Sequence, residues 1–202
     1  MYLSKYRTMV KIVDFATSFN EVLWNQFQNY LVTTTDDLKY NYIDIDPQNF
    51  VSFPVVIVDN TIICFSALQV NTDWWGEGIG RISSRMWIHP NYRHSGKFNG
   101  GSKFLNTTYC LPLQLAKATL IGLDCVFISR ADNLKGFEEY LKLIKINCGT
   151  DFILKSNKYA LNGPCYVEDP ESMKQWVMLH CLTDNGQQRW DQQMKKFELA
   201  KI

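Results

Sequence analysis

The chain has 202 residues, of which 46% are hydrophobic and 20% are charged. This is enough to bury one good core, so the simplest organisation is a single domain with a short appended element. Basic and acidic residues nearly cancel, leaving a formal net charge of +1, which argues against nucleic acid or an anionic membrane as a general partner. No apolar run approaches the roughly 20 residues that span a bilayer, and the first residues lack the pattern of a signal segment. We therefore expect a cytoplasmic protein.

The six cysteines are widely spaced and form no Cys-x-x-Cys pair. Several lie in apolar runs, where cysteine behaves as a small hydrophobe, so we expect reduced thiols. Asp44 and Asp46 stand directly before Pro47 without a third ligand nearby. Such a pair fits a solvated turn better than a cation site, and we expect no bound metal.

The first part of the chain has the pattern of a strand followed by a helix. Residues 8–15 alternate apolar and polar side chains with period two, which predicts a strand. An amphipathic helix follows, in which Thr17 or Ser18 would be the N-cap and Glu21 would complete a capping box with Ser18. Residues 33–49 are polar and lack a clear period, so they predict a loop or a short second helix.

Three further β-rich stretches predict an antiparallel meander. Residues 53–58 and 61–70 are separated by Asp59-Asn60, a pair typical of hairpin turns. A second hairpin, across a loop with two tryptophans and two glycines, leads into a strand at 81–88. Pro90 ends this strand, because proline cannot donate to a ladder.

The segment after that strand has the composition of an anion-binding loop. Residues 92–97 place small side chains and backbone amides beside three basic residues, an arrangement suited to phosphate oxygens. An apolar helix at 111–122 and a buried strand at 125–129 follow. Because a helix-length crossover joins the strands at 81–88 and 125–129, we expect them to run parallel and to splay apart. Pro112 allows a helix that starts near residue 111, or one that starts near residue 102 and kinks.

This central region resembles the cofactor-binding centre of the GNAT superfamily of N-acyltransferases. The resemblance rests on a strand followed by His89-Pro90, Tyr92-Arg93 and Gly96, and then by a helix. It implies that the loop amides hold the pyrophosphate of acetyl-CoA. One position departs from the family pattern, since Phe98 stands where a second glycine is expected.

A second motif lies on the helix predicted at 134–146. Asn133, Gly136 and Tyr140 match the spacing of Asn-x-x-Ala-x-x-x-Tyr, which many of these acyltransferases carry at the start of the same helix. The resemblance implies that Asn133 contacts the pantetheine arm of the cofactor and that Tyr140 protonates the departing thiolate. From the residues alone, Asn133 could equally be a helix cap and Tyr140 a core residue.

The resemblance implies an α/β fold in which a central mixed β-sheet is flanked by helices. Residues 151–161 predict a strand, and residues 174–183 predict a strand or a helix, of which the strand fits the family pattern. Residues 186–201 then predict an extra C-terminal helix. We expect an acyltransferase domain at 8–183 and a C-terminal helical extension at 184–202.

Two functions remain open at this stage. The first is an N-acyltransferase that moves an acetyl group from acetyl-CoA to an amine by direct attack on the thioester, with a small-molecule or peptide acceptor. The second is a GNAT-fold protein without turnover that binds a ligand or a protein, which the Phe98 departure favours. The sequence leaves a homodimer open.

The residues for the acyltransferase reaction divide into two groups. Tyr140 is the candidate acid and Glu77, on the loop before the strand at 81–88, is the candidate base, with His89 as a second base candidate. The residues expected to bind the cofactor are Met86, Trp87, Ile88, Arg93, His94, Ser95, Gly96 and Asn133.

Overall fold

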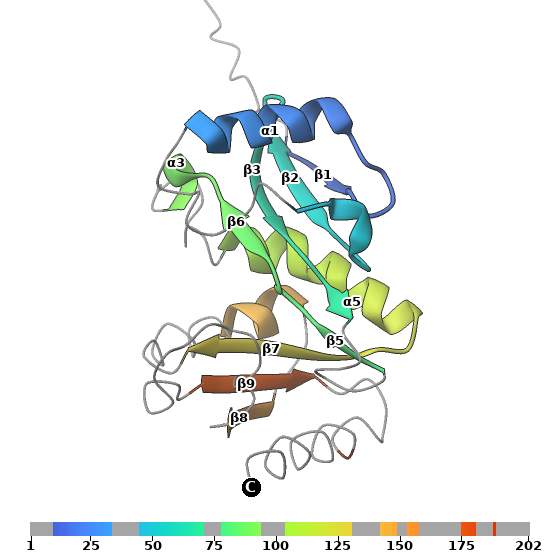
Figure 1. Cartoon of the computed structure of the whole chain (residues 1–202). Helices are drawn as coiled ribbons and strands as arrows, with labels where there is room; N and C mark the ends of the chain where they lie inside the picture. The colour runs from blue at the N-terminus through green and yellow to red at the C-terminus, as the bar shows by residue number, and fades with distance from the viewer. Residues whose placement is uncertain are drawn as a thin grey trace, which may run out of the picture.

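The computed structural model describes residues 10–33, 45–70, 78–93, 104–130, 142–148, 153–157, 175–180 and 188. The strands in these ranges form two sheets with helices beside them (Figure 1). The first sheet is antiparallel, in the order β1 (Val10–Asp14), β2 (Pro54–Val58), β3 (Thr61–Ser66) and β6 (Met86–Ile88). The second sheet is mixed, in the order β4 (Gln69–Val70), β5 (Ile79–Arg81), β7 (Asp124–Arg130), β9 (Gln175–His180) and β8 (Ile153–Asn157). The mixed α/β architecture predicted from the sequence is therefore confirmed.

Helices cover both faces of the first sheet. They are α1 (Glu21–Thr33), the 3-10 turn η2 (Pro47–Asn49), α3 (Pro90–Arg93), the π-helical segment η3 (Asn106–Cys110) and α5 (Leu111–Leu120). Val55 and Ile57 pack in the core under α1, whereas Val56 packs with Cys110 of η3 on the opposite face. In the described part of the chain, no helix is long and apolar enough to cross a membrane.

The start of α1 differs from the prediction. The Leu23 N–H donates to Asn20 Oδ1 at 3.1 Å, which makes Asn20 the N-cap. Thr17 and Ser18 do not cap the helix, because their N–H groups donate to the Asp14 carbonyl and close a turn after β1. The predicted capping box of Ser18 and Glu21 was therefore wrong, since an intervening turn already uses the backbone at Ser18.

An aromatic cluster forms the core between α1 and the first sheet. Trp24 and Phe27 from α1 contact Phe65 of β3, with ring centroids 5.7 and 5.5 Å apart. Phe27 also packs edge-on against Trp87 of β6 at 4.7 Å. All four rings are at most 4% exposed. This cluster fixes β6 to the sheet through its side chains as well as through its ladder.

The hairpin between β2 and β3 is as predicted. Asp59 and Asn60 have φ angles of 47° and 57°, and a two-residue type I′ turn requires positive φ at both positions. The Val58↔Thr61 pair closes the hairpin.

The strand predicted at 81–88 is two strands. β5 ends at Arg81 and β6 begins at Met86, and Ser83 between them has a left-handed φ of 51°. Opposite this break, the Ala67 N–H donates to the Arg85 carbonyl and the Ser84 N–H donates to the Ala67 carbonyl, each at 2.9 Å. Two residues therefore face one, which is a β-bulge that bends the strand from one sheet into the other.

Substituting Gly80 is expected to destabilise the second sheet. An added Cβ would lie 2.9 Å from Leu68 Cδ1 and 3.3 Å from Leu123 Cδ1, and both leucines are buried. Gly80→Val should lower the free energy of unfolding by about 2 kcal/mol through overpacking, as measured by urea denaturation. Thr61→Val, at an exposed strand position, should stay within about 0.5 kcal/mol of the original protein. An unchanged midpoint for Gly80→Val would contradict the close packing around Gly80.

The helix before β7 begins ahead of Leu111. Helical structure is present from Phe104, and the Leu111 N–H donates to the Asn106 carbonyl in a π-helical bond. Pro112 cannot donate to the preceding turn and its ring would crowd a regular α-helix there. The wider π turn accommodates it, so the structure favours the predicted alternative of an early, irregular helix.

The C-terminal part confirms two predicted strands. β8 and β9 lie within residues 151–161 and 174–183, and β9 pairs antiparallel with both β7 and β8. The helix predicted at 186–201 lies outside the described residues except for Gln188, as does the boundary between 183 and 184.

Candidate active site

The candidate site lies where the chain of β5 and β6 separates from β7. β5 pairs parallel with β7 through Ile79↔Asp124, Gly80↔Cys125 and Arg81↔Val126, and the Ile82 N–H still donates to the Val126 carbonyl at 2.9 Å. After Ser83 the chain joins β3 in the first sheet. Figure 1 shows β6 and β7 running apart beyond this point. The predicted parallel pairing holds for β5, whereas β6 belongs to the other sheet.

The hydrogen bonds between β3 and β6 determine which backbone groups of β6 face the place where β6 and β7 separate. The Ala67 N–H bonds to the Arg85 carbonyl and the His89 N–H bonds to the Ile63 carbonyl, each toward β3. Because alternate residues of an antiparallel strand bond to the same neighbour, Trp87 also turns its backbone toward β3. Met86 and Ile88 turn theirs to the opposite side, where β7 diverges.

The three residues predicted on this strand therefore differ in their positions. The backbones of Met86 and Ile88 face the separation from β7. Trp87 faces β3 with its backbone, and its indole is 2% exposed in the aromatic core under α1. The structure thus brings two of the three predicted positions to the site.

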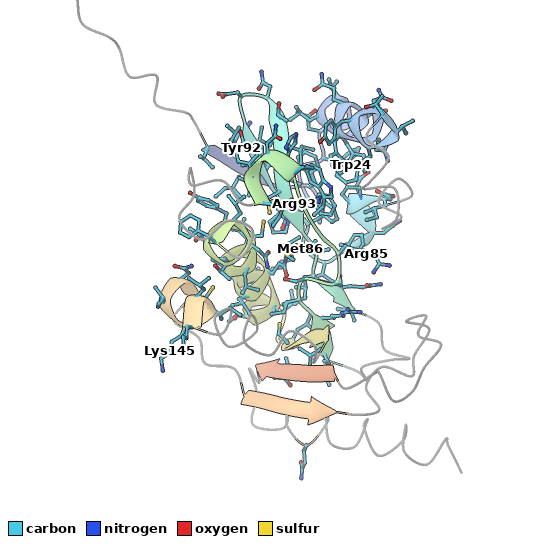
Figure 2. All side chains as sticks on the ribbon, turned by 90° about the vertical axis from the view of Figure 1, so that its left-hand side faces the viewer. Trp24, Arg85, Met86, Tyr92, Arg93 and Lys145 are labelled. Atoms are coloured by element: carbon cyan, nitrogen blue, oxygen red, sulfur yellow. The ribbon has the colours of Figure 1, made fainter. Side chains whose placement is uncertain are left out.

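Arg93 is anchored at the end of β6. The chain turns through the short helix α3, where the Tyr92 N–H donates to the His89 carbonyl at 2.8 Å. The Arg93 Nε then reaches back and donates to the Ile88 carbonyl at 2.8 Å. In Figure 2, Arg93 and Met86 are labelled between α1 and α5. This contact holds a positive charge at the point where the predicted anion-binding loop begins.

His89 makes the contacts of a structural histidine. Its Nδ1 accepts a hydrogen bond from the Asn91 N–H at 3.2 Å, and its ring stacks on Tyr30 at 5.0 Å and 22°. It also lines a pocket of about 170 Å³ between α1 and the β2–β3 hairpin, together with Gln26, Asn60 and Thr61. As a base candidate, His89 would have to act through its other ring nitrogen.

Sequence reasoning missed a buried polar cluster at the strand break. The Ser83 N–H donates to Gln114 Oε1 at 3.0 Å, and the Ser83 Oγ lies 3.1 Å from Asn106 Nδ2 and 3.2 Å from Ser66 Oγ. Ser66, Asn106 and Gln114 have no exposed surface. In the sequence, the sign of this cluster is that polar residues interrupt apolar segments. Ser83 and Ser84 lie inside an apolar strand, and Asn106 and Gln114 lie inside an apolar helix.

Cys110, Cys125 and Cys148 offer no activated thiol. Burial raises the pKa of Cys125 to about 12 and that of Cys148 to about 11. The pKa of Cys110 is also raised, first by burial and then by its contact with Cys64, whose sulfur lies 3.8 Å away. None of these four cysteines is in a disulfide, and the three with a raised pKa are thiols, which are poorer nucleophiles than thiolates.

The other predicted site residues lie outside the described residues. They are Glu77, His94, Ser95, Gly96, Asn133 and Tyr140.

Solved structures with a similar fold include several acetyltransferases. One described as a probable acetyltransferase from Staphylococcus epidermidis matches with a TM-score of 0.51 and 8% identity, over 87% of this chain and 100% of that chain. An acetyltransferase of the GNAT family from Streptococcus pneumoniae has a TM-score of 0.46 and 13% identity, over 85% and 97%. A Bacillus subtilis acetyltransferase in complex with CoA has a TM-score of 0.43 and 12% identity, over 87% and 98%.

No protein-family model matches the sequence, and no curated protein matches it either. The assignment therefore rests on the structure. The Staphylococcus epidermidis match spans most of both chains, and the two sheets meet at a strand that pairs parallel with β7 and then diverges. The chain thus shares the fold of this probable acetyltransferase.

Proposed function

We propose that this protein is an acyl-CoA-dependent N-acyltransferase that transfers an acetyl group from acetyl-CoA to an amine. The observation that carries the proposal is the separation of β6 from β7, with the backbones of Met86 and Ile88 turned toward it and Arg93 anchored at its end. An extended ligand that carries amide groups can bond to such a strand edge as an added strand would.

Among the described residues, Met86, Ile88 and Arg93 would bind this cofactor. Backbone groups of Met86 and Ile88 would bond to the amides of the pantetheine arm, and Asn133 would contact the same arm. The guanidinium of Arg93 would attract the diphosphate, with amides of His94, Ser95 and Gly96 as further donors. Acetyl-CoA supplies a thioester whose carbonyl carbon is open to attack by an amine.

The protein's own groups would handle the protons. Tyr140 would donate its phenol proton to the sulfur of the departing thiolate, and Glu77 would take a proton from the attacking ammonium. His89 is the second candidate for this base. Its Nδ1 accepts a hydrogen bond from the Asn91 N–H.

A binding or interaction module without turnover is the second candidate function. Phe98 favours it, because a bulky residue replaces a glycine in the loop that approaches the diphosphate most closely in the family pattern. This candidate differs from the first in turnover and not in fold.

Acetyl-CoA is expected to stabilise the protein against thermal unfolding. A ligand at 100 times its dissociation constant adds about 2.7 kcal/mol to the free energy of unfolding, which a thermal-shift assay resolves readily. Acetyl phosphate at the same concentration should have a much smaller effect, since it lacks the pantetheine arm. If millimolar acetyl-CoA causes no shift in melting temperature, the protein does not bind this cofactor, and the proposed reaction is contradicted as well. Binding without thiol release toward any amine of a broad panel would favour the non-catalytic module.

A further inference from the structure

Gln114 of α5 holds the backbone at the point where the strand changes sheets. The Ile82 N–H bonds to β7 through Val126, and the Ser84 N–H bonds to Ala67 beside β3. Ser83 lies between these two ladders. Its N–H is bonded by the side chain of Gln114 at 3.0 Å instead of by a strand.

This contact replaces a ladder bond that the bulge removes. A buried backbone N–H needs a partner, and its loss is costly. Ser83 also has a left-handed φ of 51°, a conformation that residues other than glycine adopt only when their surroundings hold them there. The Ser83 Oγ contacts with Asn106 and Ser66 add to this restraint. The polar cluster thus sets the direction in which β6 leaves Ser83.

A second observation indicates that the cluster is more than a structural clamp. Gln114 is fully buried, and its Nε2 has no hydrogen-bond partner within the described structure. Buried polar groups that serve only the fold are normally satisfied. A donor left over at the divergence of two strands is suited to an oxygen atom that arrives with a ligand.

We propose that Gln114 is a positioning residue for the acyl donor. Its Oε1 fixes the Ser83 amide, and through the bulge it orients the Met86 and Ile88 backbone toward the separation from β7. The inference rests on the proposed function, because it assigns to Gln114 a part in binding acetyl-CoA along β6. It adds a residue from the opposite side of the sheet that the sequence motifs do not include.

Gln114→Met tests the inference, because methionine has a similar length and cannot accept the Ser83 hydrogen bond. We expect the dissociation constant for acetyl-CoA, measured by calorimetry, to rise about tenfold. Hydrogen exchange of the amides from Ser83 to Ile88 should also become faster in the ligand-free variant. Gln114→Glu keeps an oxygen that can accept the Ser83 hydrogen bond but loses the Nε2 donor, so its affinity should lie between those of Gln114→Met and the original protein.

Leu115→Met is the matched control. Leu115 is the next residue of α5 and is also buried, but its side chain belongs to an apolar core cluster with Leu68 and Leu123. Its substitution should change the melting temperature by packing alone and leave the affinity within about twofold.

The outcomes separate this inference from the proposed function. If the original protein does not bind acetyl-CoA, the proposed function fails, and the positioning role fails with it. If the original protein binds and Gln114→Met binds equally well, only the role of Gln114 is overturned. The same conclusion follows if Gln114→Met and Gln114→Glu lose affinity equally, since a role in filling space would not distinguish an oxygen acceptor from a sulfur.

Discussion

Replacing Tyr140 with phenylalanine is expected to lower turnover by about 10²- to 10⁴-fold, the usual contribution of general acid catalysis. In the proposed reaction the phenol of Tyr140 donates its proton to the thiolate as the carbon–sulfur bond breaks. Phenylalanine keeps the ring and removes only the oxygen. The melting temperature and the affinity for acetyl-CoA should therefore change little. Thiol release would be followed with an amine acceptor identified from a panel.

Tyr109→Phe is a suitable control for this measurement. Tyr109 packs edge-on against Phe104 at 6.2 Å, on the η3 side of the first sheet, and it has no place in the proposed reaction. Its phenylalanine variant should react at the original rate. If Tyr140→Phe also reacts at the original rate, the acid lies elsewhere. A large fall in melting temperature would instead identify Tyr140 as a core residue.

Charge reversal at Arg93 is expected to weaken acetyl-CoA binding by at least about 100-fold. Opposite charges about 5 Å apart attract by about 3 kcal/mol at an effective dielectric constant of about 20, which corresponds to roughly that factor in affinity. Arg93→Glu removes this attraction and also the Nε bond to the Ile88 carbonyl at 2.8 Å. Calorimetric titration at low and high salt would measure the loss, because salt should weaken the original protein's binding more than that of the variant.

Two further variants serve as comparisons for Arg93→Glu. Arg93→Lys keeps the charge but cannot reproduce the fixed guanidinium geometry, so its affinity should fall between those of the original protein and Arg93→Glu. Lys11→Glu makes the same change in net charge on β1, at the opposite edge of the first sheet, and should have little effect. If Arg93→Glu and the original protein bind acetyl-CoA with equal affinity, the predicted anion-binding loop is not part of the cofactor site.

Part of the candidate site could be located from the sequence because its signal is local. The Pro90 stop and the basic segment after it identified the end of β6 as the place to look, and the structure brings Met86, Ile88 and Arg93 there. Trp87 was predicted to bind the cofactor together with Met86 and Ile88. The sequence does not reveal which residues of a strand form backbone hydrogen bonds to which neighbouring strand. The alternation follows only from the pairing of β6 with β3.

Gln114 and Ser83 could not be predicted as partners. They are 31 residues apart, and each looks like an isolated polar residue in an apolar element. The N-cap of α1 was missed for a related reason. Ser18 has a better local capping pattern than Asn20, but Asp14 accepts bonds from the backbone of Thr17 and Ser18 and delays the helix.

By itself, the sequence determined the elements whose causes lie within a few residues. Alternation predicted β1, β-rich runs predicted β2 and β3, Asp59-Asn60 produced the type I′ turn, and Pro90 ended β6. Tertiary structure alone decided that the strand after Gly80 would divide between two sheets. The physical reason is competition for backbone hydrogen bonds, because β3 and β7 both bond to that strand from distant parts of the chain. At Ser83 the backbone N–H bonds to neither strand, and it donates instead to Oε1 of Gln114.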